Sequence, residues 1–96
     1  MKFSHEKLIV YQRSMEFIEF VNHIATPKNI SFSALEQLDR ASSSIPLNIA
    51  EGTGKYTGKD KCRYYDIARG SALESSACLD VLLKRKIISE KDVEVG

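Results

Sequence analysis

Apolar side chains recur along residues 4–25 at the three- and four-residue spacing that is typical of an α-helix. On a helical wheel they form two neighbouring stripes, which leave only a narrow polar strip. The first stripe contains Leu8, Tyr11, Met15, Ile18 and Ala25, and the second contains Val10, Phe17, Phe20, Val21 and Ile24. Because a helix in a small bundle buries one face, we expect the second stripe to form a subunit interface. Ser4 is the expected N-cap, and Thr26-Pro27 is expected to end the helix.

A second helical pattern begins near Ser31 or Ser33, where Ser33-Ala34-Leu35-Glu36 fits a capping box. It continues through Pro46, and Gly52-Thr53-Gly54 is expected to end it. The positions that keep helical spacing are Leu35, Leu38, Ser42, Ile45 and Ile49. Proline inside a helix removes one backbone donor and costs about 3 kcal/mol. We therefore predict a kink at Pro46, with nearby Ser hydroxyls and Asn48 supplying local hydrogen bonds.

A third helix is expected over residues 59–86, after a loop at Lys55-Tyr56-Thr57-Gly58. Its expected core stripe is Tyr65, Ala68, Ala72, Ser76, Leu79 and Leu83. The small residues in this stripe let a neighbouring helix approach closely, and we expect Gly70 to have a packing reason as well. Ser89 is the expected cap of a fourth helix, for which the residues up to Gly96 provide only two turns, so that its remainder is either absent or supplied by further residues. The pattern predicts an all-α, antiparallel up-and-down bundle of three long helices and a truncated fourth.

Length and charge narrow the class of protein. A chain of 96 residues, 43% of them hydrophobic and 28% charged, is expected to form one domain over residues 1–96. Fourteen basic and thirteen acidic residues nearly cancel, so electrostatic recognition must be local. We expect a cytoplasmic protein, because the first residues lack a signal peptide and no apolar run is long enough for a membrane span. Cys62 and Cys78, about 24 Å apart on one helix, are expected to be reduced thiols.

The sequence offers no complete catalytic group. Glu19 and His23 have helical spacing, but no second motif completes a carboxylate-bridged metal site. The serines of residues 42–44 lack an indicated base, because His5 and His23 lie on another helix. We therefore expect no enzymatic activity, metal, cofactor or small-molecule substrate.

A basic and aromatic segment is the best candidate for a nucleic-acid surface, because Lys and Arg neutralise phosphates and exposed Tyr stacks on unpaired bases. Its residues are Lys55, Tyr56, Lys59, Lys61, Arg63, Tyr64 and Arg69. The alternative is that this segment has no binding role. In that case Tyr65 belongs to the core, Asp60 and Asp66 form ion pairs with neighbouring Lys and Arg side chains, and the lysines are simply solvated. A second cluster, Lys84-Arg85-Lys86, fits the favourable placement of cations at a helix C-terminus.

Four charged residues lie near the apolar stripes: Arg40, Glu51, Arg69 and Glu74. We expect them to form an ion-pair network around Pro46 that fixes helix register, and the alternative is a polar pocket that faces the lumen of a ring. The sequence does not decide which of these charges pair.

Four segments carry a resemblance to a known family. They are Leu8–Gln12 (LIVYQ), Leu38–Ser42 (LDRAS), Ser44–Gly52 (SIPLNIAEG) and Arg63–Glu74 (RYYDIARGSALE). The chain resembles the small bacterial helical-bundle proteins named after reading frames in intervening sequences of 23S rRNA genes. The family-motif positions are Arg40, Ser44, Ile45, Pro46, Asn48, Glu51, Gly52, Gly70 and Glu74. The chain departs from the family in its short C-terminus and in Asp39, where a second basic residue is common.

The resemblance implies a ring-like homo-oligomer, a pentamer, of helical bundles. It also implies nucleic-acid association, since a relative that serves diversity-generating retroelements engages RNA and a reverse transcriptase. We therefore expect a non-enzymatic oligomeric binding protein whose partner is RNA or a nucleoprotein. The alternative is a structural or protein-interaction scaffold that does not bind nucleic acid.

Overall fold

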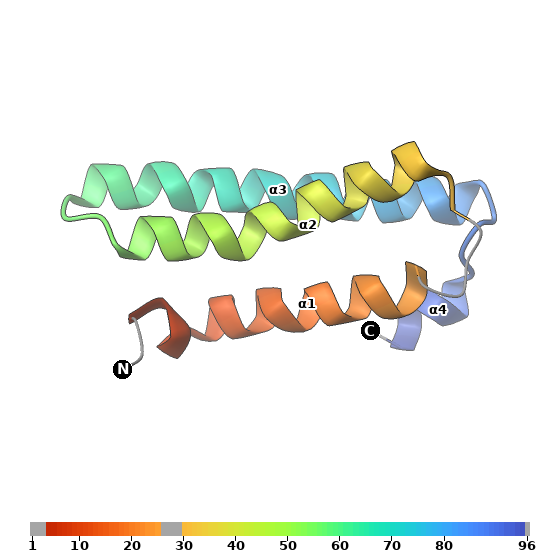
Figure 1. Ribbon diagram of the computed structural model, residues 1–96, viewed down its shortest axis with the longest axis horizontal. Helices are drawn as coiled ribbons and strands as arrows, with labels where there is room; N and C mark the ends of the chain where they lie inside the picture. Colours follow the sequence, from red (N-terminus) through yellow and green to blue (C-terminus); the bar gives the residue numbers. More distant parts are fainter. Residues whose placement is uncertain (1–3, 26–29, 96) are drawn as a thin grey trace.

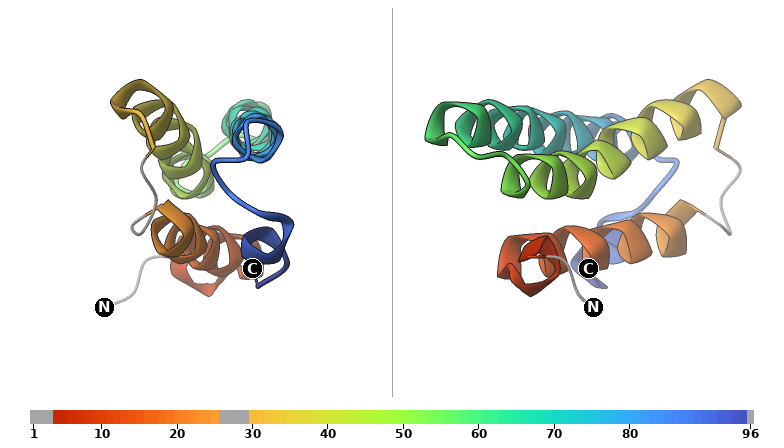
Figure 2. Two further views of the ribbon diagram at one scale, coloured as in Figure 1. Left: turned by 90° about the vertical axis from the view of Figure 1, so that its right-hand side faces the viewer. Right: turned by 60° about the vertical axis from the view of Figure 1, so that its left-hand side comes forward.

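The computed structural model describes residues 4–25 and 30–95, and this part of the chain is helical without strands (Figure 1). The elements are η1 (Ser4–Lys7), α1 (Ile9–Ala25), α2 (Phe32–Thr53), α3 (Gly58–Lys84) and α4 (Glu90–Val95). The predicted all-α fold with three long helices and a short fourth is confirmed for these residues. Figure 1 shows the chain reversing direction from α1 to α2 and again from α2 to α3. Seen along the bundle in Figure 2, the four α-helices stand at four corners, with α4 beside α1.

The N-terminal segment differs from the single helix predicted over residues 4–25. A 3₁₀ turn, η1, precedes Leu8, and the α-helix begins only at Ile9. The Leu8 amide donates to the His5 carbonyl at 3.1 Å, and Gln12 Nε2 donates to the Glu6 carbonyl at 3.2 Å. The bond from Leu8 to His5 closes a tighter turn than the α-helical pattern provides, and the Gln12 side chain satisfies a further carbonyl of this turn. The side chain of Ser4 and the predicted terminator Thr26-Pro27 lie outside the described residues.

Helix α2 is capped by Ser31, one of the two predicted starting positions. Its Oγ accepts a hydrogen bond from the Ala34 amide at 3.3 Å, whereas the Glu36 carboxylate pairs with Arg40 at 3.1 Å. The predicted capping box at Ser33–Glu36 is therefore wrong. The helix continues through Pro46 to Thr53, and the Gly54 amide bonds back to the Ala50 carbonyl at 3.2 Å. The kink at Pro46 stays a prediction.

The connections around α3 are set by local caps. Thr57 Oγ1 accepts from the Asp60 amide at 3.1 Å and starts the helix. The helix ends at Lys84, two residues before the predicted end, and the chain turns at Lys86 with a φ of 59°. The Ile87 amide then donates to the Leu82 carbonyl at 3.0 Å, which closes a Schellman-type end. Ser89 caps α4 as predicted, since its Oγ accepts from the Asp92 amide at 3.2 Å.

Two groups of buried side chains hold the bundle together. The larger is formed by Val21, Ile24, Leu38, Leu79, Leu82 and Ile88, and the smaller by Ile45, Ile49 and Ala68. Leu38 has no exposed surface and lies in the larger group, which joins α1, α2, α3 and the connection to α4. Burial of apolar side chains at this point therefore stabilises the helices together.

The buried face of α3 is rotated relative to the predicted stripe. Ala68 and Leu79 are buried as expected, but Ala72 and Ser76 are exposed. Ser75 and Leu82 are buried in their place, and Ser75 Oγ donates to the Ser71 carbonyl at 2.8 Å. This rotation follows the packing partner, because α3 makes most of its contacts with α2.

The cysteine thiols of this helix, Cys62 and Cys78, are both free, as predicted. Among the described helices, none has the length and apolar character needed to cross a membrane.

Candidate functional site

The turn between α2 and α3 gathers most of the predicted basic and aromatic residues. Lys55 Nζ lies 5.0 Å from the centroid of the Tyr64 ring, and the Arg63 guanidinium carbon lies 5.1 Å from the same centroid. Arg63 also donates to the Tyr64 hydroxyl at 3.3 Å. These cation–π contacts place two positive charges beside one tyrosine. The cations are thus held together at one end of the bundle.

Lys61 has a structural role in the same turn. Its Nζ donates to the Thr53 carbonyl at 3.2 Å, at the C-terminal end of α2. A cation at this end satisfies a carbonyl without an intrahelical partner and is favoured by the helix dipole. The Lys61 ammonium group therefore helps to hold α3 to the end of α2, whereas the Lys59 side chain is exposed.

The three tyrosines near this turn have different environments. Tyr56 is fully exposed and Tyr64 is partly buried under its cations. The Tyr65 hydroxyl shares a hydrogen bond of 2.9 Å with Thr53 Oγ1, and its ring lines a groove along the bundle. Arg69 also lines that groove and does not join the cations of the turn. The nucleic-acid surface of Lys55, Tyr56, Lys59, Lys61, Arg63, Tyr64 and Arg69 stays a prediction.

The family-motif residues of α2 include a polar link to α3. Asn48 Nδ2 donates to the Ser44 carbonyl at 2.8 Å and to Ser44 Oγ at 2.9 Å. Ser71 Oγ, on α3, donates to the same Ser44 Oγ at 2.7 Å. Ile45 and Pro46 are buried on the neighbouring face of α2. The predicted role of the Ser and Asn side chains in local hydrogen bonding around Pro46 agrees with these contacts.

Two glycines of the motif have opposite surroundings. A Cβ atom built on Gly52 would lie 2.9 Å from Tyr65 Cε1 and 3.0 Å from Tyr64 Cβ, so α2 and α3 approach each other closely at this point. A Cβ atom on Gly70 would meet nothing within 4 Å. The packing reason expected for Gly70 is therefore absent within the described part of the chain.

The four charged residues proposed as one ion-pair network do not come together. Arg40 pairs with Glu36 along α2, and both side chains are more than half exposed. Glu51, Arg69 and Glu74 are exposed as well. Such surface pairs contribute little to stability. The side-chain hydrogen bonds that join α2 to α3 include Ser71 to Ser44 and Tyr65 to Thr53.

The predicted interface stripe of α1 divides into two parts. Val21 and Ile24 are buried in the core of the chain itself, and Phe17 and Phe20 pack against that core. Val10 is 59% exposed, and Ile9, outside the predicted stripe, is 70% exposed. The buried members need no second subunit to cover them, whereas the apolar start of α1 faces solvent.

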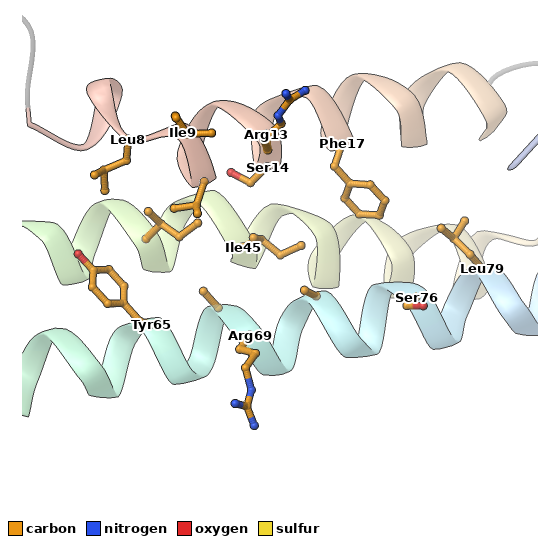
Figure 3. A pocket seen from close by; sticks show the side chains of 14 residues that line it. Leu8, Ile9, Arg13, Ser14, Phe17, Ile45, Tyr65, Arg69, Ser76 and Leu79 are labelled. Carbon is orange, nitrogen blue, oxygen red and sulfur yellow. The ribbon is translucent and has the colours of Figure 1, made fainter. Parts of the chain in front are cut away.

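This exposed start of α1 lines an apolar groove of about 800 Å³ between α1 and α3 (Figure 3). Ile45 and Ile49 of α2 and the buried Ala68 of α3 form its base, and the exposed side of α3 contributes Ala72 and Ser76. The sequence interpretation missed the groove, although its signal was present. Ala72 and Ser76 of the predicted α3 stripe face this space, whereas Ala68 packs in the buried group with Ile45 and Ile49 of α2.

The candidate catalytic and metal-binding side chains lie far apart within the described ranges, residues 4–25 and 30–95. No group of three or more His, Cys, Asp or Glu side chains converges there in a way that would hold a metal ion. His5 packs edge-on against Tyr11 with ring centroids 4.8 Å apart, and both it and the exposed His23 lie on the N-terminal part of the chain. Ser42 Oγ donates to the Asp39 carbonyl at 3.2 Å, which is a local helix contact.

The fold and the polar link define a small helical-bundle protein with a basic turn and an apolar groove. A family model described as 23S rRNA-intervening sequence protein matches residues 6–95, and the chain belongs to this family. The match includes all four motif segments, so the resemblance noted in the sequence is confirmed. No curated protein matches the chain.

Proposed function

We propose that the chain is a non-enzymatic, cytoplasmic binding protein that associates with RNA or with a nucleoprotein. The observation that carries this proposal is the gathering of Lys55, Lys59, Lys61 and Arg63 around one turn that also exposes Tyr56. The family description supports it, because it refers to an intervening sequence of 23S rRNA.

The chemistry of the turn suits a single-stranded or looped RNA. Its cations neutralise phosphates and release counterions, which is the main source of affinity in such complexes. Tyr56 has a free ring for stacking on an unpaired base, whereas Tyr64 already contacts Lys55 and Arg63. With a net charge of only +1, the protein depends on this local concentration of charge.

A salt titration with a fluorescent single-stranded RNA tests the proposal. Replacing Lys55, Lys59 and Arg63 by Ala is expected to weaken binding and to reduce the slope of log K against log salt by about 2. The matched control replaces Lys84, Arg85 and Lys86 by Ala, which removes the same charge at the opposite end of α3. Equal effects of the two triple variants, or binding independent of salt, would contradict this site.

We also propose that the protein forms a homo-oligomer, and by family resemblance a pentamer. The exposed apolar residues at the start of α1, Ile9 and Val10, support a partner on this face. Light scattering at micromolar concentration is expected to give a multiple of the 10.8 kDa chain mass. Val10→Asp should lower that mass, and a monomer in the wild-type protein would refute the oligomer.

A further inference from the structure

One exposed face of α3 has the spacing of a coiled-coil seam. Steps of four and three residues alternate along it, and all six of its positions are exposed. They are Asp66, Gly70, Leu73, Ala77, Asp80 and Lys84. None of the six lines the groove between α1 and α3, and no described helix lies on the far side of α3 from α2 (Figure 2). These six residues, the outer seam of α3, therefore form a surface separate from the groove.

The middle of the outer seam is apolar and has gaps. Leu73 is 65% exposed, and Val81, at the edge of the seam, is 49% exposed. A Cβ atom on Gly70 would meet nothing within 4 Å, and Ala77 is exposed as well. Glycine in an exposed helix interior is unfavourable relative to alanine, so its presence calls for a reason. Large side chains beside small ones are what two closely packed helices need, because each ridge then enters a groove of its partner.

The ends of the outer seam carry opposite charges, with Asp66 near the start of α3 and Lys84 at its end. Among the described side chains, neither residue has an ion-pair partner. In a parallel pair of α3 helices, Asp66 would oppose Asp66 and Lys84 would oppose Lys84. In an antiparallel pair, each Asp66 faces Lys84 of the other copy, so both ends attract. The charges therefore favour a second copy of this chain in antiparallel orientation.

The same alignment fits the rest of the outer seam. Residues that face each other share one midpoint along α3, so Leu73 lies opposite Ala77 and Gly70 lies opposite Asp80. The missing side chain at Gly70 leaves room for Asp80 of the other copy. Asp80 also comes beside Arg69 of that copy, and Figure 3 shows the Arg69 guanidinium pointing out of the groove. The seam is thus complementary to itself in both size and charge.

We infer that two copies of the chain pair through the outer seam, with α3 antiparallel and a two-fold axis between Leu73 and Ala77. Leu73 of each copy packs on Ala77 of the other, and two Asp66–Lys84 ion pairs close the ends. Glu74 of the two copies come near each other at one edge, and this repulsion and the small area keep the contact weak. The pairing uses neither the basic turn nor the start of α1, so it does not rest on the proposed function.

Sedimentation equilibrium of the full chain carrying Val10→Asp tests this pairing, because that change blocks the α1 face proposed for the oligomer. Between about 10 and 500 µM, the mass of this parent variant is expected to rise from 10.8 kDa toward twice that value, as for a small and transient interface. A mass that stays at 10.8 kDa over this range would overturn the inference. The wild-type chain is measured separately, so failure of the α1 interface and failure of the α3 pairing are distinguished.

Charge reversal in the parent variant identifies the alignment. Asp66→Lys and Lys84→Asp each place like charges at both ends of the pair, so each alone is expected to weaken pairing at least about tenfold. An equal mixture of the two variants restores opposite charges at both ends, and dimers are expected to form again. The two positions are about 27 Å apart along one helix, so this rescue requires contact between copies. No gain in mass on mixing would contradict the inference.

A control pair of variants separates this contact from general attraction between charged chains. Asp39→Lys and Lys91→Asp make the same changes of charge at exposed positions of α2 and α4, away from the outer seam. Each is expected to pair as the parent does, alone and in the mixture. Circular dichroism should show the same helical content in all variants, since every changed residue is exposed. Equal loss and rescue in the control pair would mean that net charge drives association, and the inference would be wrong.

Discussion

The two sides of α2 are packed in different ways. Toward α3, α2 makes hydrogen bonds and approaches closely. Ser71 bonds to Ser44 at 2.7 Å, and Tyr65 bonds to Thr53 at 2.9 Å. At Gly52 the neighbouring α3 residues leave no room for a side chain on α2. Toward α1, the contact is made by apolar side chains such as Val21 and Ile24. Hydrogen bonds are directional and apolar contacts are not, so the α2–α3 pair has a fixed register while α1 is held mainly by burial.

This difference explains where the molecule keeps an open surface. The α2–α3 side is closed by small residues and hydrogen bonds, whereas α1 covers only part of the inner face and leaves the apolar groove.

Leu38→Ala is expected to have the largest effect on stability. Leu38 is completely buried in the group that joins α1, α2 and α3, so its truncation should lower the free energy of unfolding by about 2–5 kcal/mol. Urea denaturation followed by circular dichroism measures the change. Leu47→Ala is the matched control, because Leu47 is 68% exposed on the same helix and should change stability by less than about 0.5 kcal/mol. Similar losses in both variants would contradict the assigned core.

Gly52→Ala tests the close approach of α2 and α3. The added methyl group would press on the Tyr65 ring and on Tyr64 Cβ, and we expect a net loss of about 1–2 kcal/mol despite the better helix propensity of Ala. Gly70→Ala meets open space on α3 and should raise the free energy of unfolding by up to about 1 kcal/mol. Thermal unfolding of the pair provides the comparison. A loss at Gly70 would instead reveal a neighbour that the single chain does not contain.

Ser71→Ala removes the hydrogen bond from α3 to Ser44 and should cost about 1 kcal/mol. Asn48 would still donate to Ser44, so the effect should remain below that of Gly52→Ala. Ser76→Ala, on the exposed groove side of α3, is the control and should change the unfolding free energy by less than about 0.5 kcal/mol. Urea midpoints that move equally in both variants would rule out a polar link between α2 and α3.

The pH dependence of Cys78 is expected to give the smallest effect. Burial, and then the nearby carboxylate of Glu74, raise the pKa of the Cys78 thiol above its ordinary value of 9.0. Because the folded pKa is the higher one, the contribution of Cys78 to stability is complete below pH 9.0 and is lost as the pH rises through the folded pKa. Unfolding curves at pH 7.5 and pH 10 should therefore differ less in Cys78→Ala than in the wild-type chain. A pH difference that stays unchanged in Cys78→Ala would contradict this assignment.

Much of the local structure was predictable from the sequence, because its causes act over one helical turn. Ser89 caps α4 as predicted, and Ser31 was one of two starting positions considered for α2. The cap at Thr57 was not predicted, since residues 55–58 were expected to be a loop and α3 begins at Gly58. The choice between Ser31 and Ser33 required the structure, since both serines are followed by plausible helical residues. The 3₁₀ turn before Leu8 was missed because its residues also fit an α-helical pattern.

The candidate site was predicted less completely. The cations of the turn are close in sequence and therefore close in space, so Lys55, Arg63 and Tyr64 were found together. Arg69 was assigned to them as well, and it also lines the edge of the groove, because helical spacing does not reveal which neighbour faces a given side chain. The groove itself was missed for the same reason.

The sequence alone determined the helical class, the number of helices and the family, because periodicity, caps and a long motif are encoded locally. Only the tertiary structure decided that Ser75 and Leu82, and not Ala72 and Ser76, turn inward on α3. It also decided that Gly52 lies against the Tyr65 ring while Gly70 stands free. Which α3 residues are buried, and what surrounds each glycine, depends on how α1 and α2 pack against α3. That packing involves side chains that are far apart in the sequence.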